Sequence, residues 1–250
     1  MIPDLFSPHA APFRLEGTNG EAVVLTHGFT GVPAHFRPLA EFLNGHGYTV
    51  NVPLLAGHGT SPTDMATTGA DDWIRSVRQA GQAVADHRRV HLAGLSMGGL
   101  LSILAARDVA ASTITTINSP IIVRNKRLYL APLAHRLVPE VSWPDEAPPP
   151  LDPEVAPYWL TYDAYRTESA AELLAVIRRA YRAARRLRRP ALVIQSRVDE
   201  SVDPRSAELL AKALGPTCDL VWLDHSIHNS LLDRERDLIH RAVLRRITDL

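Results

Sequence analysis

The 250-residue sequence contains one cysteine, two lysines and no long run of apolar residues. The lone thiol, Cys218, cannot form an internal disulfide and lies beside an apolar segment, so we expect a buried structural thiol and not a reactive one. Without a run of about 18 apolar residues, the sequence offers no transmembrane helix. The first residues also lack the cationic start and apolar core of a signal peptide, so we expect a cytoplasmic protein.

The sequence has no excess of charge either, because 27 Lys and Arg residues balance 27 Asp and Glu residues. This balance gives no indication of a polyanionic partner, and we expect no nucleic-acid binding. A hydrophobic content of 46% and a charged content of 22% are those of an ordinary globular protein. A chain of this length can bury a sizeable core, and no pattern in it specifies an oligomeric state.

One stretch stands out, an apolar run that ends in Gly-x-Ser-x-Gly. It covers residues 90–99, reads Val-His-Leu-Ala-Gly-Leu-Ser-Met-Gly-Gly and continues into an apolar segment typical of a helix. A strand, a tight turn and a helix form a nucleophile elbow, in which Ser96 would stand at the edge of a sheet. Gly94 and Gly98 suit that turn because strand and helix would leave no room for a Cβ atom. The alternative is a purely structural turn, and the rest of the chain must decide.

Strands and helices alternate along most of the chain. Apolar and β-branched segments predict strands at 21–27, 48–52, 90–95, 113–117, 190–195 and 220–223. Helical periodicity predicts helices at about 36–45, 71–86, 97–106, 168–184, 204–214 and 234–247. Several of the strands are apolar throughout. This pattern indicates a mostly parallel central sheet with helices on both faces, an α/β fold.

The alternation fails between residues 120 and 167. Prolines stand there at positions 132, 139, 144, 148, 149, 150, 153 and 157. Tyrosine and tryptophan are nevertheless concentrated in this segment, whereas disordered linkers are poor in aromatic residues. We therefore expect residues 120–167 to form a folded lid, inserted over the C-terminal edge of a core made of residues 1–119 and 168–250. The alternative is an irregular surface excursion.

A serine nucleophile needs a positioned base, and the base needs a carboxylate that fixes its tautomer. In a parallel sheet covered on both faces, these groups belong on loops that follow later strands. Beyond the strand at 190–195, Asp203 precedes Pro204 and is explained as a helix N-cap. Asp199 lies mid-loop without such a structural role, so it is our candidate for the orienting acid. Glu200 and Asp203 remain alternatives.

Three histidines follow Asp199 in the chain. His240 falls within an amphipathic helix, where we expect it at the surface. His225 abuts the end of a strand, whereas His228 lies further out among small polar residues, with room to reach a neighbouring loop. We therefore predict His228 as the general base, with His225 as the alternative.

Attack on a carbonyl creates an oxyanion that needs two backbone N–H donors. The residue after the nucleophile, Met97, should supply one donor. The loop after the first strand should supply the other, through Phe29. We expect His27 to hold that loop by hydrogen bonds. His58 has no second ligand at metal spacing, so we predict a loop anchor, with no metal and no cofactor.

The order Ser, Asp, His on alternating strands and helices resembles that of the α/β-hydrolase superfamily. Four segments carry the likeness: Leu-Thr-His-Gly-Phe-Thr-Gly at 25–31, Leu-Leu-Ala-Gly-His-Gly at 54–59, Gly-Leu-Ser-Met-Gly-Gly at 94–99 and Ser-Arg-Val-Asp at 196–199. They are similar to segments of small bacterial carboxylesterases and monoacylglycerol lipases. The resemblance implies an α/β-hydrolase fold, a triad of Ser96, Asp199 and His228, and oxyanion amides at Phe29 and Met97.

By this resemblance we expect a serine hydrolase that cleaves carboxylic esters through an acyl-enzyme. Aromatic and aliphatic residues of the lid favour an apolar acyl chain, so the expected partner is a fatty-acyl ester or a monoacylglycerol. The same groups serve thioesterases, peptidases and C–C bond hydrolases. A ligand-binding protein on the hydrolase scaffold, with the triad unused, is an alternative of a different class.

Overall fold

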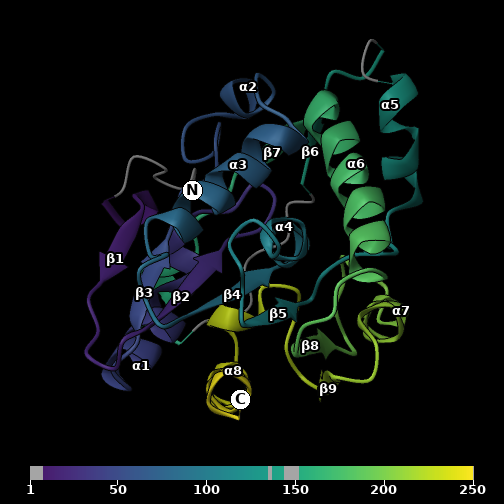
Figure 1. Ribbon diagram of the computed structural model, residues 1–250. Helices are drawn as coiled ribbons and strands as arrows, with labels where there is room; N and C mark the ends of the chain where they lie inside the picture. Colours follow the sequence, from purple (N-terminus) through teal and green to yellow (C-terminus); the bar gives the residue numbers. More distant parts are fainter. Residues whose placement is uncertain (1–7, 135–136, 144–151, 250) are drawn as a thin grey trace.

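A seven-stranded sheet forms the centre of the molecule (Figure 1). The computed structural model describes residues 8–134, 137–143 and 152–249. Within them, the strand order across the sheet is β1-β3-β2-β4-β5-β8-β9. The bounds are β1 Phe13–Leu15, β2 Glu21–Thr26, β3 Thr49–Val52, β4 Arg89–Leu95, β5 Thr113–Ile117, β8 Ala191–Ser196 and β9 Cys218–Leu223. All neighbouring pairs in this sheet are parallel except β1 with β3, which confirms the predicted mostly parallel sheet.

Helices cover both faces of the sheet (Figure 1). One layer holds α3 (Ala70–Gln82), α4 (Met97–Ala105), α6 (Thr167–Ala184) and α7 (Arg205–Leu214), and the other holds α1 (Arg37–Gly45) and α8 (Arg236–Thr248). Each layer encloses its own apolar core: Trp73 and Leu100 lie in one, Phe36 and Val243 in the other. The predicted α/β architecture is therefore confirmed.

The central strands are buried along their whole length. Every residue of β2, β5 and β8 is buried, as a strand covered on both faces requires. Because β2, β3, β4, β5, β8 and β9 run parallel, their carboxyl ends meet at one edge of the sheet. The loops that follow β2, β4, β5, β8 and β9 gather at this edge, where ligands bind in open α/β sheets.

The segment 120–167 contains only short elements within its described residues. They are η3 (Lys126–Leu130), α5 (Ala131–Ala134), β6 (Glu140–Ser142), η4 (Ala156–Tyr158) and β7 (Ala164–Arg166). β6 pairs antiparallel with β7 directly before α6 begins. Leu133 and Leu137 are 82% and 86% exposed, so the segment presents large apolar side chains at its surface. Its role as a lid stays a prediction, and the prolines at 144 and 148–150 lie outside the described residues.

Strand β1 and the short helix α2 are among the elements that the sequence analysis did not assign. The sequence analysis assigned no strand before residue 21, and β1 pairs there with β3 at the edge of the sheet. The guanidinium of Arg37 lies 3.6 Å from the centre of the Phe13 ring and covers this edge. The short helix α2 (Pro62–Met65) lies in the connection between β3 and α3. Its first turn is capped by Ser61, whose Oγ accepts the N–H of Asp64. Both elements are too short to show a periodic pattern.

His240 is buried, so its expected surface position was wrong. The residue is 6% exposed because α8 packs on α1, and its ring lies 5.1 Å from that of Phe42. Cys218 is partly buried at the start of β9, where burial and Asp219 raise the pKa of the thiol to about 12. That pKa agrees with the expected unreactive thiol. Across the described residues, no helix has the length and apolar character needed to cross a membrane.

Candidate active site

Ser96 occupies a strained turn between β4 and α4. Its backbone has φ 55° and ψ −121°, a conformation that non-glycine residues rarely adopt. Strand β4 ends at Leu95 and helix α4 begins at Met97, so Ser96 alone forms the turn. The side chain is partly exposed, and its hydroxyl has no hydrogen-bond partner among the described residues. This is the geometry predicted for a nucleophile elbow.

Two glycines allow the elbow to close. A Cβ atom on Gly94 would lie 2.2 Å from the backbone carbon of Gly98. A Cβ atom on Gly98 would lie 2.0 Å from the carbonyl oxygen of Thr26, at the end of β2. Both distances are far below van der Waals contact, so any side chain at either position would push α4 away from the sheet.

The predicted oxyanion amides flank Ser96. Met97 is the first residue of α4, and its N–H is among the unpaired donors of that helix end. The loop after β2 approaches from the other side: a Cβ atom on Gly28 would lie 3.2 Å from Cβ of Ser96. Within the described part of the chain, neither the Phe29 N–H nor the Met97 N–H donates to another protein group. Both donors therefore remain available to a ligand.

Residues 160–162 of the predicted lid, the segment 120–167 (the lid segment below), hold this loop in place. The N–H of Tyr162 donates to the carbonyl oxygen of Thr30 at 3.2 Å, and Thr161 Oγ1 donates to the same oxygen. Nε2–H of His35 donates to the carbonyl oxygen of Leu160 at 2.7 Å. Thr30 needs this support because its φ is 61°.

The loops after β8 and β9 bring Asp199 and His228 together. Nδ1–H of His228 donates to Oδ2 of Asp199 at 2.8 Å. Asp199 is fully buried, and the His228 side chain is 21% exposed. The second carboxylate oxygen of Asp199 accepts the backbone N–H groups of Ser201 and Val202. Asp199 therefore also closes its own turn, and our view that it lacks a structural role was wrong.

Opposing effects act on the pKa of His228. Burial lowers the pKa of the imidazole. The charge and hydrogen bond of Asp199, together with the charge of Glu200, raise it by more, so the pKa lies above its usual value of 6.5. The hydrogen bond to Asp199 also fixes the tautomer, with the proton on Nδ1 and a lone pair on Nε2.

The alternative residues have other partners. Glu200 accepts the backbone N–H of His228 at 2.9 Å, through its carboxylate. Asp203 accepts the N–H of Arg205 and pairs with its guanidinium, which lowers the pKa of the carboxyl to about 2. His225 is exposed, and its backbone N–H donates to Glu235. Among the described residues, none of these three side chains forms a hydrogen bond with the side chain of Asp199 or of His228.

Two residues that the sequence analysis did not single out connect these loops. Ser119 Oγ donates to the carbonyl oxygen of Ser96 at 2.8 Å. Asn118 Nδ2–H donates to the carbonyl oxygen of His228 at 2.7 Å. Both residues directly follow β5, between the strand that carries Ser96 and the strand that leads to Asp199. The positive φ of Asn118, 47°, is visible only in the structure.

Comparisons with known proteins identify the family. A family model described as the alpha/beta hydrolase family matches residues 23–241. The chain belongs to the α/β-hydrolase family. It is 32% identical over 242 residues to a thermostable monoacylglycerol lipase of Bacillus sp. (strain H-257), covering 92% of this chain and 91% of the relative. It is 28% identical over 236 residues to a carboxylesterase of Bacillus subtilis (strain 168), covering 93% and 94%.

A solved structure of a similar protein has the same fold as this α/β-hydrolase. It is described under the metagenome-derived lipolytic enzymes LipS and LipT, with a TM-score of 0.88 and 30% identity. The match covers 97% of this chain and 99% of the other.

Buried histidines anchor the loops of this hydrolase. His27 Nε2 accepts the N–H of Leu55 at 3.1 Å, and its Nδ1–H donates to the carbonyl oxygen of Gly28. Burial and the neighbouring His58 lower the pKa of His27, so it stays neutral. His58 Nδ1–H donates to Ala56 within its own turn. His27 thus holds the loop as predicted, and the described residues contain no cluster of three or more groups able to hold a metal.

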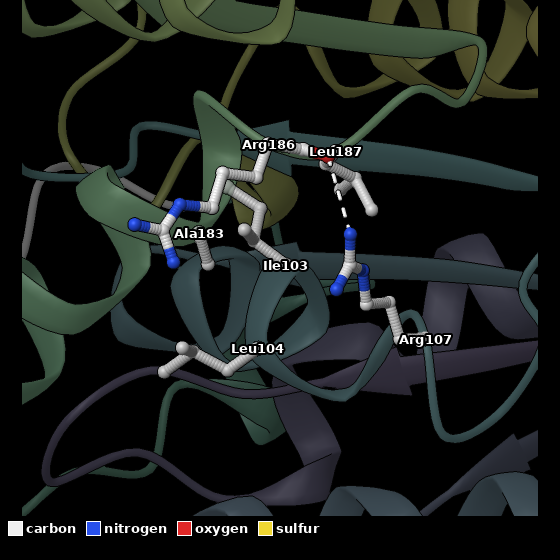
Figure 2. Close-up of a pocket in the computed structure, with 6 residues that line it drawn as sticks. All are labelled: Ile103, Leu104, Arg107, Ala183, Arg186 and Leu187. Carbon is white, nitrogen blue, oxygen red and sulfur yellow. Dashed lines mark hydrogen bonds between the residues drawn. The ribbon is translucent and has the colours of Figure 1, made fainter.

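A surface cavity of about 160 Å³ lies away from these residues (Figure 2). It is enclosed by residues near the C-terminal ends of α4 and α6, namely Ile103, Leu104, Arg107, Ala183, Arg186 and Leu187. Arg107 donates across it to the carbonyl oxygen of Arg186. Because Ser96 precedes the opposite end of α4, this cavity is separate from the predicted site.

Proposed function

We propose that this α/β-hydrolase cleaves carboxylic esters through an acyl-enzyme on Ser96, with His228 as base and Asp199 as orienting acid. The observation that carries the proposal is the hydrogen bond between His228 Nδ1 and Asp199 Oδ2, 2.8 Å long, at the sheet edge where Ser96 forms its strained turn. The named relatives, a carboxylesterase and a monoacylglycerol lipase, support the same reaction class.

The proposed reaction begins with proton transfer from Ser96 Oγ to Nε2 of His228 as Oγ attacks the ester carbonyl. The tetrahedral oxyanion accepts hydrogen bonds from the N–H groups of Phe29 and Met97. The bond to the alcohol then breaks, and His228 gives its proton to the leaving oxygen. Water next attacks the acyl-enzyme with His228 again as base, releasing the acid and restoring Ser96. Asp199 stays ionised and stabilises the imidazolium throughout.

The loop geometry is compatible with this sequence of steps. Ser119 holds the carbonyl of Ser96, and the adjacent Asn118 holds the carbonyl of His228, so one short segment places both residues at the same edge. The charge of His228 lowers the pKa of His35, and the His35 ring lies next to Gly31 in the loop after β2. Contacts between nucleophile and base are often long in unliganded enzymes and tighten when substrate binds.

The substrate we propose is an ester with an apolar acyl chain, such as a fatty-acyl ester or a monoacylglycerol. The ring of Phe29 packs edge-on against Tyr165 of the lid segment at 5.6 Å and against Trp73 at 6.2 Å. Trp143 lies 4.8 Å from the same Tyr165 ring. An aromatic wall next to the proposed oxyanion donor favours apolar groups over charged ones.

A substrate series tests the proposal. p-Nitrophenyl esters of increasing acyl length are hydrolysed by the wild type and by Ser96→Ala, and both are treated with a phosphonate ester and analysed by mass spectrometry. We expect one phosphonate per chain on Ser96 and a loss of at least about 10³-fold in turnover for Ser96→Ala. Absence of both labelling and ester turnover in the wild type would instead indicate a binding protein on this scaffold.

A further inference from the structure

The end of β5 contacts all three loops that carry the proposed catalytic residues. Ser119 Oγ donates to the carbonyl oxygen of Ser96. The preceding residue, Asn118, reaches the other two loops. Its Oδ1 accepts the N–H of Ser196, where the loop to Asp199 begins, and its Nδ2–H donates to the carbonyl oxygen of His228. Neither residue takes part in the chemical steps of the proposed reaction.

Asn118 is fully buried and held in one conformation. Its φ of 47° lies in the left-handed region, which asparagine tolerates better than most residues. The backbone N–H donates to the carbonyl oxygen of Ile194 in β8 at 2.9 Å. The second Nδ2–H donates to Ser230 Oγ at 3.1 Å. Every strong hydrogen-bonding group of the side chain is therefore used, so the side chain has a single orientation.

The chemistry at this position requires an amide. The oxygen of Asn118 faces a donor, the N–H of Ser196 at 2.8 Å, and the nitrogen faces an acceptor, the His228 carbonyl oxygen at 2.7 Å. A carboxylate of the same shape could still accept from Ser196. It would place an acceptor against the carbonyl oxygen of His228, and these two oxygens repel each other.

The main chain of His228 has no support from regular secondary structure. Its N–H donates to Oε2 of Glu200 at 2.9 Å, and its carbonyl accepts from Asn118. Glu200 is exposed, whereas Asn118 is buried. Because water competes for the exposed contact, the buried amide is the firmer of the two attachments. The place of the imidazole relative to Ser96 depends on this attachment.

We propose that Asn118 is a positioning residue that holds His228 in line with Ser96, using its amide to join the acid loop to the histidine loop. This inference rests on the proposed function of Ser96, Asp199 and His228. Asn118 does not touch the reacting atoms; it acts through the backbone carbonyl of His228. A displacement of about 1 Å at a general base can cost about 100-fold in rate, so the contact bears directly on turnover.

Two variants of Asn118 and one matched control test the proposal. Asn118→Asp keeps the shape and the left-handed preference but removes both Nδ2–H donors. Asn118→Gly removes the side chain without straining a φ of 47°. Thr116→Val is the control, since Thr116 lies in β5 just before Asn118, is fully buried, and has a hydroxyl without a hydrogen-bond partner among the described residues.

Each variant is assayed with a p-nitrophenyl ester at pH 8, and near-UV circular dichroism gives the folded fraction. For both Asn118 variants we expect kcat per folded molecule to fall about 10- to 100-fold, with KM changed by less than about threefold. Thr116→Val should match the wild type. A purely structural role would lower the folded fraction and leave kcat per folded molecule unchanged.

The pH profile adds a readout that stability cannot produce. Among the described residues, the titratable groups that interact electrostatically with His228 include Asp199, Glu200 and His35. A carboxylate at position 118 adds negative charge beside them, so the acid-side inflection should move to higher pH in Asn118→Asp. Asn118→Gly adds no charge, so its inflection should not move upward.

The outcomes separate the two proposals. If the wild type hydrolyses the ester and both Asn118 variants keep its kcat per folded molecule, Asn118 has no positioning role. Asn118→Gly decides alone if the Asp variant does not fold, because it buries no new charge. A wild type without turnover or phosphonate labelling would overturn the proposed function and this inference together.

Discussion

Nδ1 of His228 lies 2.8 Å from Oδ2 of Asp199, although the two residues stand on loops that follow different strands. The contact has a consequence for the base and another for the acid. It fixes the imidazole tautomer with a free lone pair on Nε2, and it keeps a buried carboxylate paired. The pH dependence of ester hydrolysis follows from this pair.

We predict that kcat/KM for ester hydrolysis falls on the acid side with an inflection above pH 6.5. Burial lowers the pKa of His228, but Asp199 and Glu200 raise it by more, so the imidazole accepts a proton more readily than a free histidine. Glu200→Gln keeps an oxygen for the His228 N–H and removes the charge, so the inflection should move down. The exposed Glu208→Gln on α7 is the control and should leave it unchanged. A rate that stays flat to pH 4 would contradict a histidine base.

Gly98→Ala should destabilise the protein by about 3 kcal/mol or more, because the new Cβ would lie 2.0 Å from the carbonyl oxygen of Thr26. The shift of α4 would also move the Met97 amide, so activity should fall with stability. Gly45→Ala at the end of α1 is the control, since a Cβ there meets no atom within 4 Å and should stabilise the helix slightly. Urea unfolding measures both changes, and equal midpoints for the two variants would rule out the crowding.

Tyr162→Phe should cost about 1–3 kcal/mol of unfolding free energy. The Tyr162 hydroxyl accepts the N–H of Thr60 and donates to the carbonyl oxygen of Gly57, so its loss leaves both backbone groups unpaired. Tyr181→Phe on α6 is the matched control, because the Tyr181 hydroxyl makes no hydrogen bond among the described residues. Thermal and urea unfolding measure the difference. Similar losses for both variants would show that this link between lid segment and core contributes nothing.

His240→Leu should reduce the loss of stability in mild acid. Burial lowers the pKa of His240 to about 4, while Asp237 opposes the shift. Between pH 6.5 and pH 4 the unfolded chain binds a proton at this histidine that the folded protein does not, so stability falls as the pH falls through this window. At pH 5 the effect is about 2 kcal/mol relative to pH 8. Urea unfolding of both proteins at pH 5 and pH 8 measures it, and identical pH dependence would contradict it.

The sequence by itself determined the features that depend on local pattern. Strands such as Thr113–Ile117 were predicted because an apolar, β-branched run fits a strand buried on both faces. The turn at Ser96 was predicted because Gly94 and Gly98 carry no Cβ atom. A strand and a helix can therefore approach each other closely at these two positions. Asp199 and His228 were expected on the loops that follow two successive strands. The structure brings their side chains into contact.

Tertiary structure decided the features that depend on contacts between distant segments. His240 lies on a helix whose pattern suggested exposure, but the packing of Phe42 buries it. Asn118 carries no recognisable signal in the sequence. The role we propose for it arises because a left-handed turn after β5 directs one amide toward two loops, 78 and 110 residues further along the chain. Local periodicity reports which face of an element is buried, whereas hydrogen bonds between loops exist only after the strands have set the loops side by side.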